Sequence, residues 1–296
     1  MRDFYTPDGS DPQMTEGQMV QMPSGMRHSI RPRRAVLEQA QKRKLAQAFE
    51  AERSSGFVSA GADLDAWDTL EIEEPGARRA LSSAMPVVDS SRTSPTARAF
   101  DLLRTRLRQT TQEHGWRNIA VTAPTTGCGN TFTAVNLALS LSRVPGSRTV
   151  LMDMNLRSPG VARAFDMTAR GSIRSYLAGD IPLGNHMIRA SETLALGLNE
   201  APDANPSETL QDSATGVTLH KMRQTLSPEL VIYDMPPMLG FDDVSAFLPQ
   251  LDGVLLVSDG TQTMARQLRE CERMLDGQVP LLGVVLNRAR KDSIAA

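Results

Sequence analysis

The stretch Ala123-Pro-Thr-Thr-Gly-Cys-Gly-Asn-Thr131 decides the fold, because it joins an apolar run to a helix-forming run through a glycine-rich loop. The apolar run is 119–122 (IAVT), and the helix-forming run is 132–141 (FTAVNLALSL). Strand, glycine loop and helix in this order are the layout of a phosphate-binding loop. Gly127 and Gly129 allow backbone N–H groups to turn toward an anion, and the first amides of the helix add a partial positive charge.

Two positions at the end of this loop bear on its chemistry. Thr131 stands where such a loop keeps the hydroxyl that holds Mg²⁺. Loops that transfer phosphoryl groups read G-x-G-K-[ST], with a lysine that reaches the β- and γ-phosphates, and this chain has Asn130 in its place. Losing one preorganised donor lowers the rate by a factor on the order of 10² to 10³, whereas the loop amides and Mg²⁺ still favour binding. We therefore expect slow hydrolysis with intact nucleotide binding.

The composition indicates a protein with a large core and no strong charge bias. The 296 residues are 40% hydrophobic with a formal net charge of −2, so nothing attracts the whole chain to nucleic acid or anionic lipid. We expect neither a signal peptide nor a membrane span, because the N-terminus has no apolar core segment and no run of 18 apolar residues occurs. The two cysteines cannot form a disulfide framework or a metal site alone, which fits a reduced compartment.

The first 93 residues differ from the rest of the chain. They are rich in Met, Gln, Pro, Gly and Ser and show no strand-like alternation, so we expect most of 1–93 to be disordered. A helix is predicted at 33–52, and the charges separate into a basic stretch at 27–44 and an acidic one at 63–74. The segment is either a solvated tail with one marginal helix or an arm that docks on a membrane surface or a partner.

From residue 94 to about residue 290 the pattern changes to alternating strands and helices. Ser94 followed by Pro95 is a helix start, and this helix should run to about Glu113. Apolar runs predict strands at 149–153, 229–234, 251–258 and 281–286, a short strand at 193–197, and two short helices across 206–226. This alternation implies a mostly parallel sheet with helices on both faces, whose ligands bind at the carboxyl ends of the strands.

Three residues can be placed from this pattern. Asp153 and Asp234 each end a predicted strand, so they should lie at the same edge of the sheet as the glycine loop. Cys271 belongs to a helical stripe with Met264, Leu268 and Leu275, which predicts a buried, structural thiol.

Five motifs in order carry a family resemblance: TAPTTGCGNTFTAVNLALSLSR, TVLMDMNLRSPG, ELVIYDMPPML, DGVLLV and LLGVVLNR. With SPTARAFDLLRTRL before them and NPSETL at 205–210, they resemble the bacterial tyrosine kinases of capsule and exopolysaccharide biosynthesis, relatives of the deviant-Walker ATPases ParA and MinD. The resemblance covers about 94–290 and implies a P-loop NTPase domain of the α/β class, between the largely disordered N-terminal region and a short tail at 291–296.

The resemblance also implies roles for single residues. ATP or ADP would be held by the loop and the end of the last strand, that is by Thr126, Gly127, Cys128, Gly129, Asn130, Thr131, Phe132, Asn287 and Arg288, the last two lying against adenine. Asp153 would orient or deprotonate the attacking hydroxyl, and Arg157 keeps the arginine of the same D-x-D-x-R motif. Mg²⁺ would be held by Thr131, Asp153 and Asp234.

The chain departs from the family pattern at four places. Besides Asn130, Asn155 replaces the second aspartate of D-x-D, and the oligomerising E-x-x-R-x-x-R reads Arg98-x-x-Asp101-x-x-Arg104. The two pocket substitutions remove charges of opposite sign, which favours retained nucleotide binding. The reversed charges at 98 and 101 fit either a homo-oligomer through the helix at 97–113 or an ordinary solvated helix face.

The fourth departure concerns tyrosine. The C-terminal KDSIAA has no tyrosine cluster, so the sequence excludes autophosphorylation of such a tail. The chain has three tyrosines, Tyr5, Tyr176 and Tyr233, and we expect Tyr233 to be buried in a strand.

Three functions remain open on these residues. We favour a nucleotide-binding protein with weak or lost catalysis, which regulates polysaccharide polymerisation or export with a membrane-bound co-polymerase or chain-length regulator. The alternative is an active ATP-dependent protein-tyrosine kinase in which Arg157 or Arg288 replaces the lysine. A ParA- or MinD-like positioning ATPase would need lysines at Thr125 and Asn130. We expect a cytoplasmic location, peripheral to the inner face of the plasma membrane, and no nucleic-acid partner.

Overall fold

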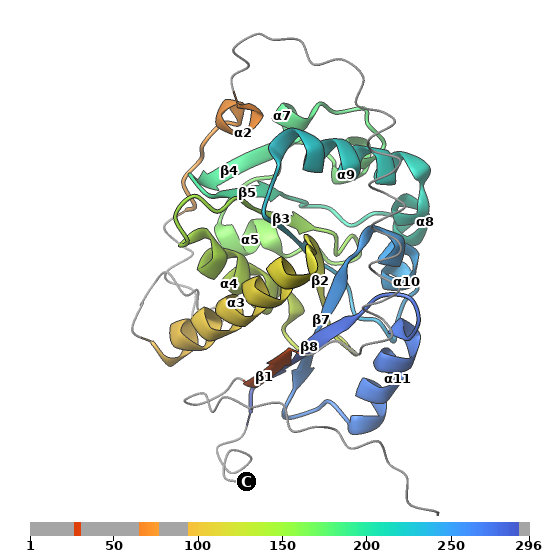
Figure 1. The fold of residues 1–296 in the computed structure, drawn as a ribbon. Coiled ribbons are helices and arrows are strands. Elements are labelled where there is room, and N and C mark those ends of the chain that lie inside the picture. The colour runs from red at the N-terminus through yellow and green to blue at the C-terminus, as the bar shows by residue number, and fades with distance from the viewer. Residues whose placement is uncertain (1–26, 31–64, 77–93, 290–296) are drawn as a thin grey trace, which may run out of the picture.

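The protein is built on one twisted sheet (Figure 1), seen in a computed structural model that describes residues 27–30, 65–76 and 94–289. Within these ranges the sheet has eight strands in the order β1-β8-β7-β2-β6-β3-β5-β4. The strands are β1 (Arg27–Ile30), β2 (Asn118–Thr122), β3 (Thr149–Asp153), β4 (Met187–Ser191), β5 (Leu194–Gly197), β6 (Leu230–Asp234), β7 (Gly253–Asp259) and β8 (Leu281–Asn287). Only the edge pairs β1–β8 and β4–β5 are antiparallel. The predicted mostly parallel α/β sheet is therefore confirmed.

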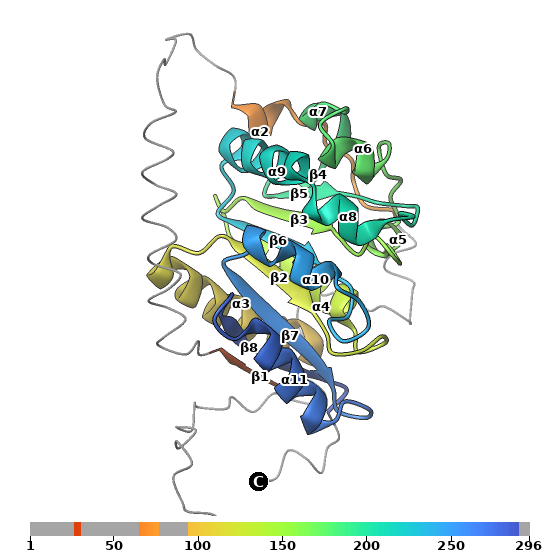
Figure 2. The same cartoon turned by 90° about the vertical axis from the view of Figure 1, so that its right-hand side faces the viewer.

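Helices cover both faces of the sheet. They are α2 (Ala66–Thr69), α3 (Pro95–His114), α4 (Asn130–Ser142), α5 (Val161–Phe165), α6 (Ile173–Leu177), α7 (Leu183–His186), α8 (Pro206–Gln211), α9 (Ser213–Leu226), α10 (Asp243–Phe247), the 3-10 turn η3 (Leu248–Gln250) and α11 (Ala265–Leu275). One hydrophobic core lies under α3, α4 and α5, and a second lies under α6, α9, α10 and α11. Figure 2 shows α8, α9, α10 and α11 together on the near side. None of the described helices combines the length and the apolar character needed to cross a bilayer.

The long helix α3 begins and ends where the sequence predicts. Ser94 caps its first turn by accepting from the N–H of Ala97, Pro95 is its first residue, and Gly115 ends it with a left-handed backbone at φ 62°. Phe100, fully buried, lies in the apolar stripe that packs α3 onto α4. Because α4 follows the glycine loop, this packing holds the loop's helix in place.

The parallel strands bring several polar residues together at their carboxyl ends. Asp153 at the end of β3 is the register partner of Asp234 at the end of β6. Asp259 at the end of β7 is the register partner of Asn287 at the end of β8. The loop between β2 and α4 starts at the same edge, because β2 lies between β6 and β7 in the sheet. The sheet thus places four polar strand ends around the glycine loop.

At the far lateral edge of the sheet, the short strand predicted at 193–197 is confirmed as β5, whereas β4 and α7 were not predicted. β4 pairs with β5 as a short antiparallel hairpin, and α7 leads directly into it. The charged Arg189 lies in the middle of β4 and interrupts its apolar run, so the pattern of apolar residues did not predict this strand. In the structure Arg189 is buried and its guanidinium donates to Asp68 at 2.9 Å and to the carbonyl of Leu70 at 3.2 Å. A third bond, from Arg189 to the carbonyl of Asp68 at 3.2 Å, completes the contacts that hold the buried guanidinium.

Two short parts of the segment 1–93, most of which we expect to be disordered, belong to the folded domain. Residues 27–30 form β1 on the edge of β8, and residues 65–76 pack beside β4. Trp67 is 1% exposed, its indole N–H donates to the carbonyl of Glu192 at 2.9 Å, and the guanidinium of Arg148 lies 5.4 Å from the ring centroid. A composition averaged over 93 residues overlooked one tryptophan with a large apolar surface. The predicted helix at 33–52 and the tail at 291–296 lie outside the described residues.

Candidate functional site

The loop between β2 and α4 has the backbone geometry of an anion site. Gly127 and Gly129 have φ values of 85° and 95°, in the left-handed region that favours glycine. A Cβ atom at Gly129 would lie 2.4 Å from the side-chain nitrogen of Asn287, so a larger residue would not fit there. Gly129 is also the N-cap of α4, and no side chain caps that helix. The first amides of α4 thus remain available to an anion.

Asn130 occupies the lysine position and turns toward the strands. Its side chain is 7% exposed, and its amide donates to Asp234 at 3.2 Å and to the carbonyl of Met235 at 2.8 Å. The side chain therefore ties the start of α4 to the end of β6. It brings no positive charge to the loop.

The two strand-end carboxylates that the sequence predicts lie side by side and fully buried. Asp153 Oδ2 accepts from the backbone N–H groups of Gly160 and Val161, both at 2.9 Å. Burial still raises the pKa of Asp153 to about 7. Burial, followed by the charge of Asp153, raises the pKa of Asp234 well above its ordinary value. Asp153 Oδ1 and Asp234 Oδ2 have no hydrogen-bond partner.

These groups fit a magnesium ion. Mg²⁺ prefers oxygen ligands and is usually held by one or two carboxylates together with phosphate oxygens. Two buried carboxylates with an unused oxygen each, next to a hydroxyl at Thr131, supply that chemistry. No cluster of three or more His, Cys, Asp or Glu side chains suited to a metal occurs in the described part of the chain. When bound, such an ion would neutralise phosphate charge.

Arg157, the other predicted catalytic residue, is bound to a partner that the sequence did not suggest. Its guanidinium donates to both carboxylate oxygens of Asp243, at 2.7 and 3.0 Å, and lies 4.1 Å from the ring centroid of Phe241. Asp243 is only 1% exposed. The arginine thus joins the loop after β3 to α10.

Asn287 and Arg288 lie against the glycine loop. Asn287 donates to the carbonyl of Cys128 at 2.9 Å, and Arg288 donates to the carbonyl of Gly127 at 2.8 Å. Arg288 also pairs with Asp259 at 2.5 Å. Both side chains therefore contact the loop through its carbonyl groups, and we call the side of the loop that they occupy its outer side.

This chain resembles several known proteins over about 60% of its length. The putative tyrosine-protein kinase EpsB of Ralstonia nicotianae is 27% identical over 198 residues, which are 65% of this chain and 26% of EpsB. The succinoglycan biosynthesis transport protein ExoP of Rhizobium meliloti is 27% identical over 182 residues, 58% of this chain and 22% of ExoP. The crystal structure of the VpsO kinase domain matches with a TM-score of 0.57 at 25% identity, over 64% of this chain and 93% of that domain.

The chain is therefore similar to bacterial tyrosine kinases over about two thirds of its length. It spans only about a quarter of the length of EpsB and ExoP. No protein-family model matches it.

The other loop positions predicted to hold the nucleotide have different environments. Thr126 is exposed at the tip of the loop. Cys128 is fully buried, with its thiol 3.5 Å from the hydroxyl of Thr263 and 3.6 Å from that of Thr125. The ring of Phe132 packs edge-on against Phe100 of α3.

The charge reversed at position 101 of α3 is bonded within the chain. Asp101 accepts from Arg104 at 3.1 Å, from Ser140 at 2.8 Å and from Arg143 at 2.5 Å. These bonds, all to Oδ1 of Asp101, tie α3 to α4. Arg98 is exposed. The homo-oligomer through 97–113 stays a prediction.

Sequence reasoning missed three residues of the site. The strand predicted at 251–258 ends one residue before Asp259. Asp259 nevertheless follows an apolar run, as Asp153 and Asp234 do. Asp243 lies in a short helix with no strong pattern. Arg163 is exposed on α5, and its charge acts on Asp153 by lowering the pKa. Only the first of these had a signal in the sequence.

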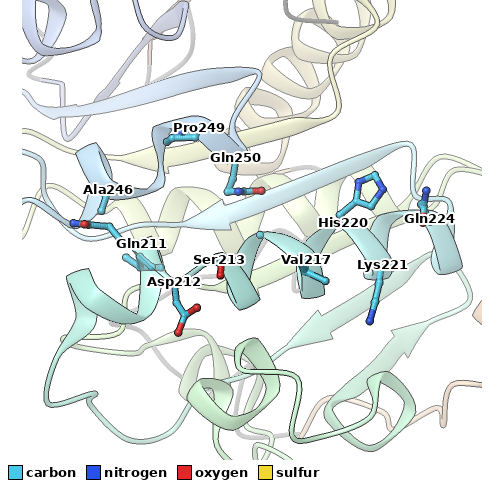
Figure 3. A pocket seen from close by; sticks show the side chains of 12 residues that line it. Gln211, Asp212, Ser213, Val217, His220, Lys221, Gln224, Ala246, Pro249 and Gln250 are labelled. Carbon is cyan, nitrogen blue, oxygen red and sulfur yellow. The ribbon is translucent and has the colours of Figure 1, made fainter. Parts of the chain in front are cut away.

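A separate pocket of about 830 Å³ lies between α9 and the segment from α10 to η3 (Figure 3). Gln211, His220, Lys221 and Gln250 are among its lining side chains. It contains none of the predicted site residues.

Proposed function

We propose that this protein binds ATP or ADP with Mg²⁺ on the loop 123–131 and acts as a nucleotide-dependent regulator with little or no phosphoryl transfer. The observation that carries the proposal is the bonding of Asn130. Its neutral amide is committed to Asp234 and Met235, so the loop keeps its amides but lacks the lysine that acts on the β- and γ-phosphates.

The two arginines that could have replaced the lysine are engaged elsewhere. Arg157 is held by the buried Asp243, and Arg288 is held by the buried Asp259. Moving either guanidinium inward would break the ion pair of a buried carboxylate, which opposes the movement. This opposition argues against rescue of catalysis and supports binding without efficient transfer.

The tyrosines of the described part of the chain are poor phosphate acceptors. Tyr176 is 1% exposed and Tyr233 is fully buried. An acceptor hydroxyl has to reach the γ-phosphate in line, which a buried side chain cannot do without local unfolding. The active protein-tyrosine kinase is therefore the less favoured proposal, and it would need another acceptor.

The names of the relatives suggest the biological setting. ExoP is a transport protein of succinoglycan biosynthesis, and EpsB is a putative tyrosine-protein kinase. By analogy with the names of these larger proteins, we place the chain in exopolysaccharide or capsule production, bound at the cytoplasmic face of the membrane to a co-polymerase or chain-length regulator.

Calorimetry and an ATPase assay on the full chain test this function. We expect ATP and ADP to bind with Mg²⁺, with turnover near background. Asn130→Lys should raise the ATPase rate by about tenfold or more, because it restores the missing cation. Asn185→Lys makes the same chemical change at an exposed position of α7 and serves as the matched control.

The outcomes separate the alternatives. Wild-type protein that binds no nucleotide in the presence of Mg²⁺ would contradict the proposal. Rapid turnover by the wild type would instead favour an active kinase. A rise in rate in Asn185→Lys as large as in Asn130→Lys would show that the added charge acts nonspecifically.

A further inference from the structure

The phosphate loop is held from outside through two of its carbonyl groups. Arg288 Nη1 donates to the carbonyl of Gly127 at 2.8 Å, and Asn287 Nδ2 donates to that of Cys128 at 2.9 Å. In a planar trans peptide the C=O and the following N–H point in opposite directions. Fixing these two carbonyls on the outer side therefore turns the N–H groups of Cys128 and Gly129 inward, where an anion would lie.

Asp259 holds Arg288 in turn. Asp259 is 1% exposed, and its Oδ2 accepts from Arg288 Nη1 at 2.5 Å. Its Oδ1 accepts from the N–H and the hydroxyl of Thr261, at 2.8 and 2.6 Å. Because one guanidinium nitrogen contacts both the carboxylate and the loop carbonyl, the position of Asp259 fixes the position of the donor to Gly127.

The backbone around these residues is equally constrained. Asp259 and Asn287 are register partners in the pair β7–β8, and the N–H of Gly260 donates to the carbonyl of Asn287 at 2.8 Å. Arg288 has a φ of 50°, which is uncommon for a residue other than glycine. Asp259, Asn287 and Arg288, which we call the loop brace, thus join the ends of two paired strands to the outer side of the loop.

We propose that Asp259 and Arg288, together with Asn287, are positioning residues that hold the loop amides in the anion-binding direction, and that they act on the phosphates and not on the base. The inference rests on the proposed nucleotide binding. The brace matters more in this chain because the lysine is replaced by Asn130, so the backbone amides provide a larger share of the interaction with phosphate.

The test compares two ligands that share the phosphates and differ in the base, MgATP and magnesium tripolyphosphate. Calorimetry on the full chain should show that Arg288→Ala and Asp259→Asn weaken both ligands by the same factor, about tenfold for the loss of one charge-assisted hydrogen bond. Arg288→Lys keeps a cation beside Asp259 and should recover most of the affinity.

Arg273→Ala is the matched control, since Arg273 forms an exposed ion pair with Glu270 on α11. It should leave the affinity for both ligands unchanged. The side chain of Arg288 is 55% exposed, so Arg288→Ala should fold even if Asp259→Asn does not.

Three results would contradict the proposal, and each has a different meaning. A loss confined to ATP would show that these side chains contact the base, and would overturn the positioning role while nucleotide binding stands. Unchanged affinity for both ligands in Arg288→Ala would overturn it as well. Wild-type protein that binds neither ligand would end the proposed function and this inference together.

Discussion

Asp153 and Asp234 are direct neighbours on the parallel strands β3 and β6, and both are fully buried. Each keeps one carboxylate oxygen without a hydrogen-bond partner. Two buried carboxylates on neighbouring strand positions oppose each other's ionisation unless a proton or a cation lies between them. Asn130 contributes one amide hydrogen bond and no charge. The pair therefore lowers the stability of the metal-free protein and favours the binding of a cation.

Removing one of these charges should stabilise the metal-free protein. Asp234→Asn eliminates the repulsion within the pair, and we expect a gain of about 1 to 2 kcal/mol, or roughly 3 to 6 °C in melting temperature. The same variant should lose the stabilisation that Mg²⁺ and ADP give the wild type. Thermal unfolding with and without both ligands measures this, with the exposed Asp276→Asn as control. A lower melting temperature in the metal-free variant would contradict the repulsion.

Arg157 should contribute to stability in the absence of nucleotide. Arg157→Ala leaves the buried Asp243 without its guanidinium partner, for an expected loss of about 3 kcal/mol in the free energy of unfolding. Urea unfolding of the ligand-free protein measures the loss. Arg273→Ala, which breaks an exposed ion pair, should change it by less than about 1 kcal/mol. Equal effects of the two variants would show that the Arg157 pair has no structural role.

Phosphotyrosine should be absent from the folded domain. After incubation with MgATP, mass spectrometry of the wild type and of Asn130→Lys should find no phosphate on Tyr176 or Tyr233, because both are buried. Denaturation followed by treatment with a separate tyrosine kinase provides the positive control for detection. Phosphate on Tyr176 in the native protein would mean that α6 opens in solution.

His186 should make the protein less stable in acid. Its ring stacks on Tyr176 with centroids 4.4 Å apart, its Nε2 has no partner, and burial lowers its pKa to about 4. A buried neutral histidine stabilises the fold fully above the unfolded pKa of about 6.5, and this contribution is lost as the pH falls toward 4. The loss should reach about 3 kcal/mol.

Urea unfolding between pH 7 and pH 4.5 measures this contribution. His186→Phe keeps a stacked ring without a titrating group, so its stability should depend less on pH over that range. If wild type and variant lose stability in parallel, His186 is not the cause.

Trp67 should hold the segment 65–76 on the domain. Trp67→Ala removes a buried indole and its hydrogen bond to Glu192, for an expected cost of about 3 to 5 kcal/mol. Ile72→Ala alters the same segment at a side chain that is 51% exposed and should cost less than about 1 kcal/mol. Urea unfolding compares the two variants, and similar small effects in both would mean that the segment does not contribute to the core.

Most of the fold was predictable because its signals are local. The strand predicted at 149–153 has the same bounds as β3, and the predicted start of α3 at Ser94 and Pro95 is confirmed. The predicted burial of Cys271 is confirmed as well. Errors occurred where a single residue interrupts a pattern, as Arg189 does in β4, or where a short packed segment lies within a long polar one, as Trp67 does.

The sequence by itself determined the glycine loop, the helix that follows it and the aspartates that end β3 and β6, because each depends on residues within a few positions. Only the tertiary structure decided which groups meet: Asn130 with Asp234, Arg157 with Asp243 and Arg288 with Asp259. An arginine can pair with any carboxylate within its reach. The order of strands in the sheet sets which one that is, and no local pattern in the chain encodes that order.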